Sequence, residues 1–280
     1  MTPFLSDRFP PDLLRPSLEE PMPEVSTHAP GSFCWIDLGT TDPAAAKRFY
    51  AELLGWEYRE NPMPEGGAYT MIRREGRDIG GLYELSPEMR EQGVPPNWLS
   101  YIAVESADAS SERAERAGAE VVMGPMDVMD VGRMAVIQDP TGAVFAVWQA
   151  KAHSGCGVVG EPGSVCWNEL MTKDAAAAKK FYSDVFGYEM EDQQMGPTAY
   201  TMLRMGERRE GGLMQIAPEM GPVPSHWMVY IAVSDIEGTI EKTKQLGGKA
   251  ITDAMDVPGV GRFAVLQDPQ GAVFSAIRLS

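Results

Sequence analysis

Long apolar runs are missing from this chain of 280 residues. None approaches the roughly 20 apolar residues that a helix needs to span a membrane. The amino-terminal end also lacks the basic start and the apolar core of a secretory signal, and it carries repeated prolines instead. We therefore expect a globular protein of the cytoplasm that has no membrane partner.

Cysteine is scarce as well. The chain has three cysteines, Cys34, Cys156 and Cys166, and no pair of them has a Cys-x-x-Cys spacing. An odd number without that spacing argues against a disulfide framework and against a zinc ribbon. Because free cysteine commonly behaves as a small apolar residue, we expect Cys34 and Cys166 to be buried on strands.

Basic side chains are outnumbered, with 24 Lys and Arg against 40 Asp and Glu, which gives a net charge of −16. Proteins recognise nucleic acids and anionic lipids by neutralising phosphates with Lys and Arg. We therefore expect no nucleic-acid partner. An acidic field would raise the local concentration of a cationic ligand, although the same acidity also serves simply to keep a protein soluble.

What the chain does contain is an internal repeat. The matching segments run the length of both copies: Trp35 with Trp167, Gly55 with Gly187, Tyr69-Thr70-Met71 with Tyr200-Thr201-Met202, Gly80-Gly81-Leu82 with Gly211-Gly212-Leu213, and Gln138-Asp139-Pro140 with Gln267-Asp268-Pro269. The offset drifts only from 132 to 129 residues, and the steps fall in loop-like stretches. A period this long that occurs twice indicates duplicated domains rather than a solenoid.

The duplication divides the chain into four parts. A proline-rich arm covers residues 1–30, the first domain covers 31–150, a Gly-rich linker covers 151–161, and the second domain covers 162–280. We expect the arm to be extended, either disordered or lying on the body of the protein.

Each domain repeats one order of elements. In the first half, alternation predicts a strand over 33–38. Asp42 suits a helix N-cap, Pro43 suits the first turn, and Gly55 ends the helix. Three strands follow, over 56–60, 68–74 and 78–84.

The second half has the same order. It comprises a strand over 99–105, a helix over 108–117, and strands over 120–128, 132–138 and 143–149. The chain is therefore predicted to be α+β, with four β-α-β-β-β modules arranged as two tandem domains. Sheets with helices on one face leave the other face free to line a cleft.

In this order the motifs resemble those of the vicinal oxygen chelate superfamily, which includes glyoxalase I, extradiol dioxygenases and the bleomycin-resistance proteins. The resemblance is carried by the strand that leads into Asp42-Pro43, by Phe49-Tyr50, by Leu54-Gly55-Trp56, by Tyr101-Ile102-Ala103-Val104 and by Asp139-Pro140-Thr141-Gly142-Ala143-Val144-Phe145, each with its counterpart in the second copy. It implies that the paired βαβββ modules of each domain form a curved sheet around a cavity.

Enzymes of this superfamily hold a divalent metal with His, Gln and Glu side chains at three places. The resemblance puts these places on Trp35, Tyr101 and Ala146 in the first copy and on Trp167, Tyr230 and Ser275 in the second. None of these six is a suitable ligand for a hard or borderline divalent metal. The only histidines, His28, His153 and His226, lie elsewhere in the sequence. We therefore predict no metal site and no cofactor.

Aromatic and acidic side chains remain at these places. Period-two alternation predicts that Phe33, Trp35 and Asp37 share one face of the first strand. By the same argument Val165, Trp167 and Glu169 share a face in the second copy, while a tyrosine approaches from the neighbouring module. The predicted ligand-binding residues are Trp35, Asp37, Tyr101, Trp167, Glu169 and Tyr230.

An indole, a phenol and a carboxylate in one cavity predict a receptor for a flat aromatic molecule, neutral or cationic, such as an antibiotic or a metabolite. The plainer alternative is that Trp35 and Trp167 fill the core. An acidic residue two positions away argues against it, because a carboxylate is costly in a sealed core without a partner. A monomer is plausible because one chain supplies both halves of an assembly, and a homodimer is the alternative.

A metal-free enzyme is the second hypothesis. Burial raises the pKa of a carboxyl, so Asp37 or Glu169 would serve as an acid or base in hydroxylase-, isomerase- or cyclase-like chemistry on an aromatic or polyketide substrate. The sequence shows no Ser-His-Asp arrangement, P-loop or dinucleotide fingerprint. Binding is the leading interpretation, and a regulatory protein with vestigial cavities is a third.

Overall fold

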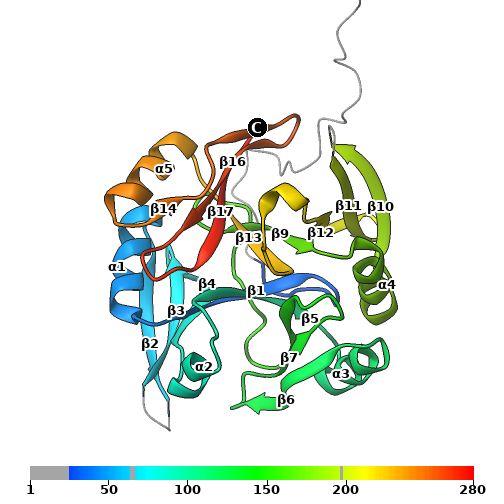
Figure 1. Cartoon of the computed structure of the whole chain (residues 1–280). Coiled ribbons are helices and arrows are strands. Elements are labelled where there is room, and N and C mark those ends of the chain that lie inside the picture. Colours follow the sequence, from blue (N-terminus) through cyan, green and yellow to red (C-terminus); the bar gives the residue numbers. More distant parts are fainter. Residues whose placement is uncertain (1–24, 64–66, 196–197) are drawn as a thin grey trace, which may run out of the picture.

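The computed structural model describes residues 25–63, 67–195 and 198–280 (Figure 1). The predicted arm therefore lies mostly outside the described residues. Within them, no helix is long and apolar enough to cross a membrane.

The first domain forms one 8-stranded sheet in the order β2-β3-β4-β1-β5-β8-β7-β6. Its elements are β1 (Phe33–Thr40), α1 (Pro43–Leu54), β2 (Glu57–Pro62), β3 (Ala68–Arg74), β4 (Arg77–Glu84), α2 (Pro87–Glu91), β5 (Asn97–Ala103), α3 (Ala107–Arg116), β6 (Glu120–Val128), β7 (Gly132–Gln138) and β8 (Val144–Ala150). The first strands of the two modules, β1 and β5, pair antiparallel at the centre of the sheet.

The second domain repeats this plan in a 9-stranded sheet, with β9 and β13 at its centre. Its elements are β9 (Val165–Thr172), α4 (Ala175–Phe186), β10 (Glu189–Met195), β11 (Thr198–Met205), β12 (Arg208–Gln215), a 3-10 turn (Pro218–Met220), β13 (His226–Ala232), α5 (Ile236–Gln245), β14 (Lys249–Ala250), β15 (Met255–Val257), β16 (Gly261–Gln267) and β17 (Val273–Leu279). Two short strands, β14 and β15, stand where the first domain has the single strand β6. The α+β class and the two tandem domains of paired modules are confirmed.

Helix α1 begins and ends where the sequence predicts. The Asp42 carboxylate accepts a hydrogen bond from the backbone N–H of Ala45 at 2.9 Å, which satisfies one free donor of the first turn. Gly55 ends the helix with a φ of 71°, in the left-handed region that glycine adopts readily. Helix α4 has the same two caps, with Asp174 at its start and Gly187 at its end.

The helices lie where the two domains meet. Helix α1 packs near α5 on one side of the molecule, and α3 packs near α4 on the other side (Figure 1). Each apolar cluster at this interface draws residues from both domains: Phe49 and Tyr50 pack with Phe274, and Phe145 packs with Phe181 and Tyr182. The two domains therefore share these two apolar clusters.

One detail of the first strand is predicted wrongly. In β1, Phe33 is paired with Ile102 whereas Trp35 is paired with Tyr101, so a β-bulge lies between them. Because neighbouring residues of β5 face opposite sides, the bulge turns Phe33 to the face opposite Trp35. Its ring packs against Trp227, with centroids 4.9 Å apart.

The second domain has the same bulge. Val165 pairs with Ile231 and Trp167 pairs with Tyr230, so Val165 and Trp167 also face opposite sides. The predicted shared faces hold for Trp35 with Asp37 and for Trp167 with Glu169, but not for the first member of either set.

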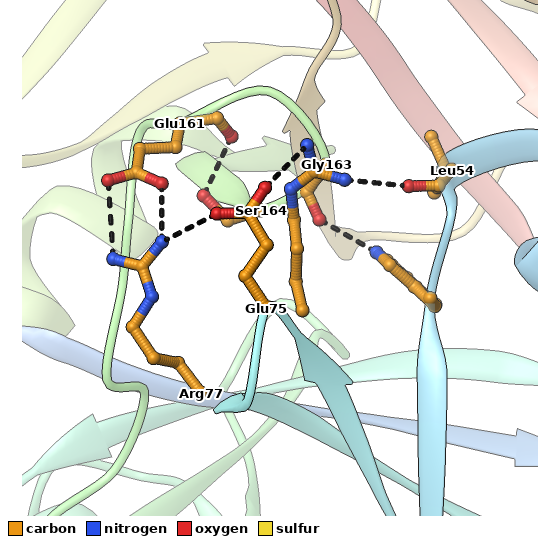
Figure 2. Close-up of polar contacts among 8 residues, drawn as sticks. Leu54, Glu75, Arg77, Glu161, Gly163 and Ser164 are labelled. Carbon is orange, nitrogen blue, oxygen red and sulfur yellow. Dashed lines mark hydrogen bonds and ion pairs between the residues drawn. The ribbon is translucent and has the colours of Figure 1, made fainter.

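The segment between the domains is fixed in place. The backbone N–H groups of Cys156 and Gly157 donate to the carbonyl oxygens of Cys34 and Asp78, each at 2.8 Å. Further along, the guanidinium of Arg77 binds both carboxylate oxygens of Glu161, at 2.7 and 3.3 Å (Figure 2). These contacts hold residues 151–161 against β1 and β4.

The three cysteines are free. Cys34 is buried, as predicted, whereas Cys166 is only partly buried. Cys156 in the linker is fully buried, and its thiol donates to the carbonyl oxygen of Ile79 at 3.1 Å.

Candidate ligand-binding site

Three neighbouring strands bring together the places that the resemblance assigns to metal ligands. Trp35 of β1 is directly opposite Tyr101 of β5, and Tyr101 is in register with Ala146 of β8. Paired residues point to the same face of a sheet. The second domain aligns Trp167, Tyr230 and Ser275 in the same way.

Asp37 lies beside this row and is almost fully buried, with 4% of its surface exposed. Its Oδ1 accepts hydrogen bonds from Trp35 Nε1 at 3.0 Å and from Tyr69 Oη at 2.6 Å, and its Oδ2 accepts one from Tyr101 Oη at 2.7 Å. Burial raises the pKa of the Asp37 carboxyl, while the hydrogen bonds from Tyr69, Tyr101 and Trp35 act in the opposite direction.

Tyr69 is a member of this cluster that the sequence prediction missed. It comes from β3, and it can reach Asp37 because Gly81 lies between them: a Cβ atom on Gly81 would stand 1.9 Å from Tyr69 Oη and 2.1 Å from Asp37 Oδ1. The repeated Tyr-Thr-Met and Gly-Gly-Leu segments were the available signal. The first segment contains Tyr69 and the second contains Gly81, and they lie on the adjacent strands β3 and β4.

The second domain carries the matching cluster. Tyr230 Oη donates to Glu169 Oε1 at 2.9 Å, and Trp167 Nε1 donates to Tyr200 Oη at 2.9 Å. Burial raises the pKa of Glu169, opposed by hydrogen bonds from Tyr230 and Tyr200. Gly212 again leaves room, since a Cβ there would stand 1.8 Å from Tyr200 Oη.

These contacts remove one argument made from the sequence. An unpartnered carboxylate would have required a ligand, but three protein donors satisfy Asp37 and two tyrosines bind Glu169. The carboxylates alone therefore do not decide between a ligand site and a packed core. The cavity beside Asp37 is the more informative feature.

A cavity of about 390 Å³ opens on the face of the first sheet that carries Trp35 and Asp37. Met63 and Met129 line it and are 43% and 72% exposed, which places them at its opening. Inside, the wall is mainly aromatic rings and thioethers, including Trp35, Tyr69, Met71, Tyr101, Met134 and Trp148.

Other lining residues come from outside the predicted set. Arg59 and Asn61 of β2, Asp78 of β4 and His153 of the linker each reach the cavity. Arg59 Nη2 lies 3.4 Å from the Asp78 carboxylate. A linker residue could not be placed here from the sequence, because the path of the linker depends on how the two domains pack.

The places that the resemblance assigns to metal ligands do not suit a divalent metal. An indole N–H is a donor only, and Ala146 has no donor atom to offer a metal. Among residues 25–63, 67–195 and 198–280, no group of three or more His, Cys, Asp or Glu side chains is placed to hold a metal ion.

Comparison with known families identifies the superfamily of this chain. Residues 32–147 and 164–275 match the family model described as the Glyoxalase/Bleomycin resistance protein/Dioxygenase superfamily. The chain belongs to this superfamily. This match confirms the resemblance that was inferred from the repeated motifs.

Two similar proteins extend over nearly the whole chain. The mycobacterial protein named "Putative glyoxylase CFP32", from Mycobacterium tuberculosis, is 42% identical over 259 residues, which is 92% of this chain and 98% of that protein. The "Anthracycline biosynthesis protein DnrV" of Streptomyces peucetius is 37% identical over 265 residues, covering 91% of this chain and 96% of its own length.

Solved structures share the fold at low sequence identity. A Mn(II)-bound glyoxalase from Novosphingobium aromaticivorans superposes with a TM-score of 0.61 at 18% identity, over 89% of this chain and 82% of that one. The 2,3-dioxygenase LapB from Pseudomonas sp. KL28 gives 0.59 at 11% identity, over 92% and 93%. At this identity the likeness speaks for the fold alone.

Proposed function

We propose that this protein binds a planar aromatic small molecule in the cavity of its first domain, without using a metal. The observation that carries the proposal is a cavity of about 390 Å³ walled by aromatic rings and thioethers beside a buried carboxylate. That size lies within the range of roughly 300–1,000 Å³ that is usual for small-molecule sites.

The composition of the wall favours a flat ligand. Aromatic side chains prefer offset or edge-on contacts with other rings, worth about 0.5–1.5 kcal/mol beyond burial. Methionine adapts its shape to an apolar partner, and Met71 and Met134 both line the cavity. The net charge of −16 would favour a cationic version of such a ligand.

The relatives narrow the class of ligand. One of them is named for anthracycline biosynthesis, and anthracyclines are planar aromatic polyketides. An aromatic polyketide, in a resistance or biosynthetic accessory role, is therefore the ligand class that we test first. We expect one chain to act as a monomer or a homodimer.

The test uses daunorubicin, a cationic anthracycline, and daunomycinone, its uncharged aglycone, as probes in calorimetric titrations. We expect both to bind, with daunorubicin bound more tightly if the negative field contributes. Trp35→Phe should weaken binding at least about tenfold, because the larger indole is part of the wall and holds Asp37. A failure of both probes to bind the wild-type protein would overturn the proposal.

Trp167→Phe is the matched control, since it makes the same change in the second domain. A loss confined to Trp35→Phe would localise binding to the first cavity. Equal losses in both variants would show that both domains bind, whereas no loss in either would exclude the predicted site residues. Metal analysis of the same protein samples should find no stoichiometric divalent ion, and a stoichiometric metal would overturn the metal-free part of the proposal.

The raised pKa values of Asp37 and Glu169 favour a second candidate, a metal-free enzyme. A carboxyl whose pKa is moved toward neutrality is suited to general acid or base catalysis. Mass spectrometry of recovered daunomycinone decides between the two: unchanged ligand supports binding alone. Altered ligand, with the change lost in Asp37→Asn or Glu169→Gln, would establish catalysis.

A further inference from the structure

His153 belongs to the linker and lies outside both copies of the repeat, yet its ring forms part of the cavity. The ring stands edge-on to Trp35, with centroids 4.6 Å apart and an interplanar angle of 89°. A second edge-on contact joins it to Trp148 at 6.0 Å. The imidazole is therefore packed between two tryptophans that also line the cavity.

The backbone holds this histidine in place. Its N–H donates to the carbonyl oxygen of Val131 at 3.0 Å, and its carbonyl oxygen accepts a hydrogen bond from Trp148 Nε1 at 2.9 Å. Val131 and Trp148 are themselves lining residues. The ring is thus positioned by the wall of the cavity rather than by the length of the linker.

The Nε2 atom of His153 is buried and has no hydrogen-bond partner among the described residues. An unpaired polar atom in a buried position is destabilising, and most such atoms in folded proteins find a partner. Asp37, by contrast, is already bound by Trp35, Tyr69 and Tyr101. Of the two lining side chains, His153 is the one that has a polar atom without a partner among the described residues.

The protonation state of the His153 ring determines which ligand groups it can hydrogen-bond. Burial lowers the pKa of His153 and so favours the neutral imidazole, in which one nitrogen is a donor and the other an acceptor. A neutral imidazole pairs well with a hydroxyl or a carbonyl. Asn61, whose amide makes no hydrogen bond with any described residue, offers a second neutral polar group in the same cavity.

We propose that His153 is a specificity-determining residue that hydrogen-bonds, through Nε2, a phenolic hydroxyl or quinone-type carbonyl on the edge of a planar aromatic ligand. This inference rests on the proposed function and adds a requirement to it. The cavity would select an oxygenated ring system over a bare hydrocarbon of similar shape, and the linker between the domains would supply the selection.

The test compares two probes, daunomycinone, which carries phenol and quinone oxygens, and fluorene, a planar hydrocarbon. His153→Phe keeps a ring between Trp35 and Trp148 but removes the nitrogen. We expect this variant to bind daunomycinone about tenfold or more weakly and to bind fluorene unchanged. His153→Gln, whose amide reaches about as far as Nε2, should restore much of the affinity for daunomycinone.

The possible outcomes separate this inference from the function on which it rests. If the wild-type protein binds daunomycinone and His153→Phe binds it equally well, the inference is wrong while the proposed function stands. Equal weakening for both probes would show that the ring acts by packing alone, which also overturns it. If the wild-type protein binds neither probe, the proposed function fails and takes the inference with it.

Discussion

A buried carboxylate in this protein is held by phenols and an indole rather than by a cation. Asp37 has three such donors, and its counterpart Glu169 is bound by two tyrosines. In both domains the indole N–H donates to a tyrosine, from Trp35 to Tyr69 and from Trp167 to Tyr200, and Trp35 donates to the Asp37 carboxylate as well. Hydrogen bonds satisfy both groups, but burial still dominates and raises both pKa values.

The raised pKa of Asp37 gives stability a pH dependence of definite sign. The unfolded chain releases this proton near the ordinary Asp value of about 3.9, whereas the folded chain retains it to higher pH. Between these two pKa values the unfolded state binds fewer protons, so the free energy of unfolding falls as pH rises. The contribution is complete below the unfolded pKa and is lost as pH passes the folded pKa.

Asp37→Asn should remove this part of the pH dependence, because the amide does not titrate. Urea denaturation of both proteins, at pH values from about 4 upward, measures the difference. Glu169→Gln should act in the same direction, since its pKa is also raised. An unchanged slope in Asp37→Asn would mean that the carboxyl titrates alike in the folded and unfolded chains.

Gly81→Ala tests the hydrogen bond between Tyr69 and Asp37. The added methyl would stand 1.9 Å from Tyr69 Oη, so the tyrosine must move and the bond must break. We expect a loss of about 1–3 kcal/mol in the free energy of unfolding, the usual cost of overpacking a core. Gly157→Ala is the control, because its nearest neighbours would be 3.6 Å from the new Cβ atom; its effect should stay within about 1 kcal/mol.

At the level of elements, much was predictable from the sequence. Helix α1 could be placed because Asp42 and Gly55 act locally, and β1 could be placed from its alternation. The bulge in β1 could not be predicted, since its signal is a pairing with β5, some 65 residues further along the chain. The same holds for the path of the linker, and therefore for His153 in the cavity.

The N-cap of α1 gives a prediction at this level. Asp42→Ala removes the hydrogen bond to the N–H of Ala45, so the free energy of unfolding should fall by about 1 kcal/mol. Asp42→Asn keeps a capping oxygen and should cost little. Denaturant unfolding of the two variants checks this. Equal losses would show that the charge of Asp42, and not the cap, is what stabilises the helix.

At the level of the whole molecule, the two copies of the repeat are joined by reciprocal hydrogen bonds, which could not be predicted from the repeat alone. Tyr50 of the first domain donates to Asp268 of the second at 3.1 Å, and Tyr182 of the second donates to Asp139 of the first at 3.0 Å. The motif Gln-Asp-Pro and the helix motif Phe-Tyr, recognised from the sequence as marks of the family, are thus partners across the interface between the domains.

These reciprocal bonds predict that the chain unfolds as one unit. Tyr50→Phe should cost about 1.5–3 kcal/mol, because it removes a donor to a buried carboxylate and also the acceptor of Trp98 Nε1. Tyr182→Phe should cost a similar amount. The two tyrosines lie in separate apolar clusters and share no hydrogen-bond partner, so the losses should add in the double variant.

The control for this prediction is Tyr58→Phe. The Tyr58 hydroxyl is buried without a hydrogen-bond partner among the described residues, so removing it should leave stability unchanged or slightly raised. Urea denaturation followed by tryptophan fluorescence and by circular dichroism should give one coincident transition for each protein. Two separate transitions in the double variant would instead mean that each domain has a core of its own, even though the clusters draw on both.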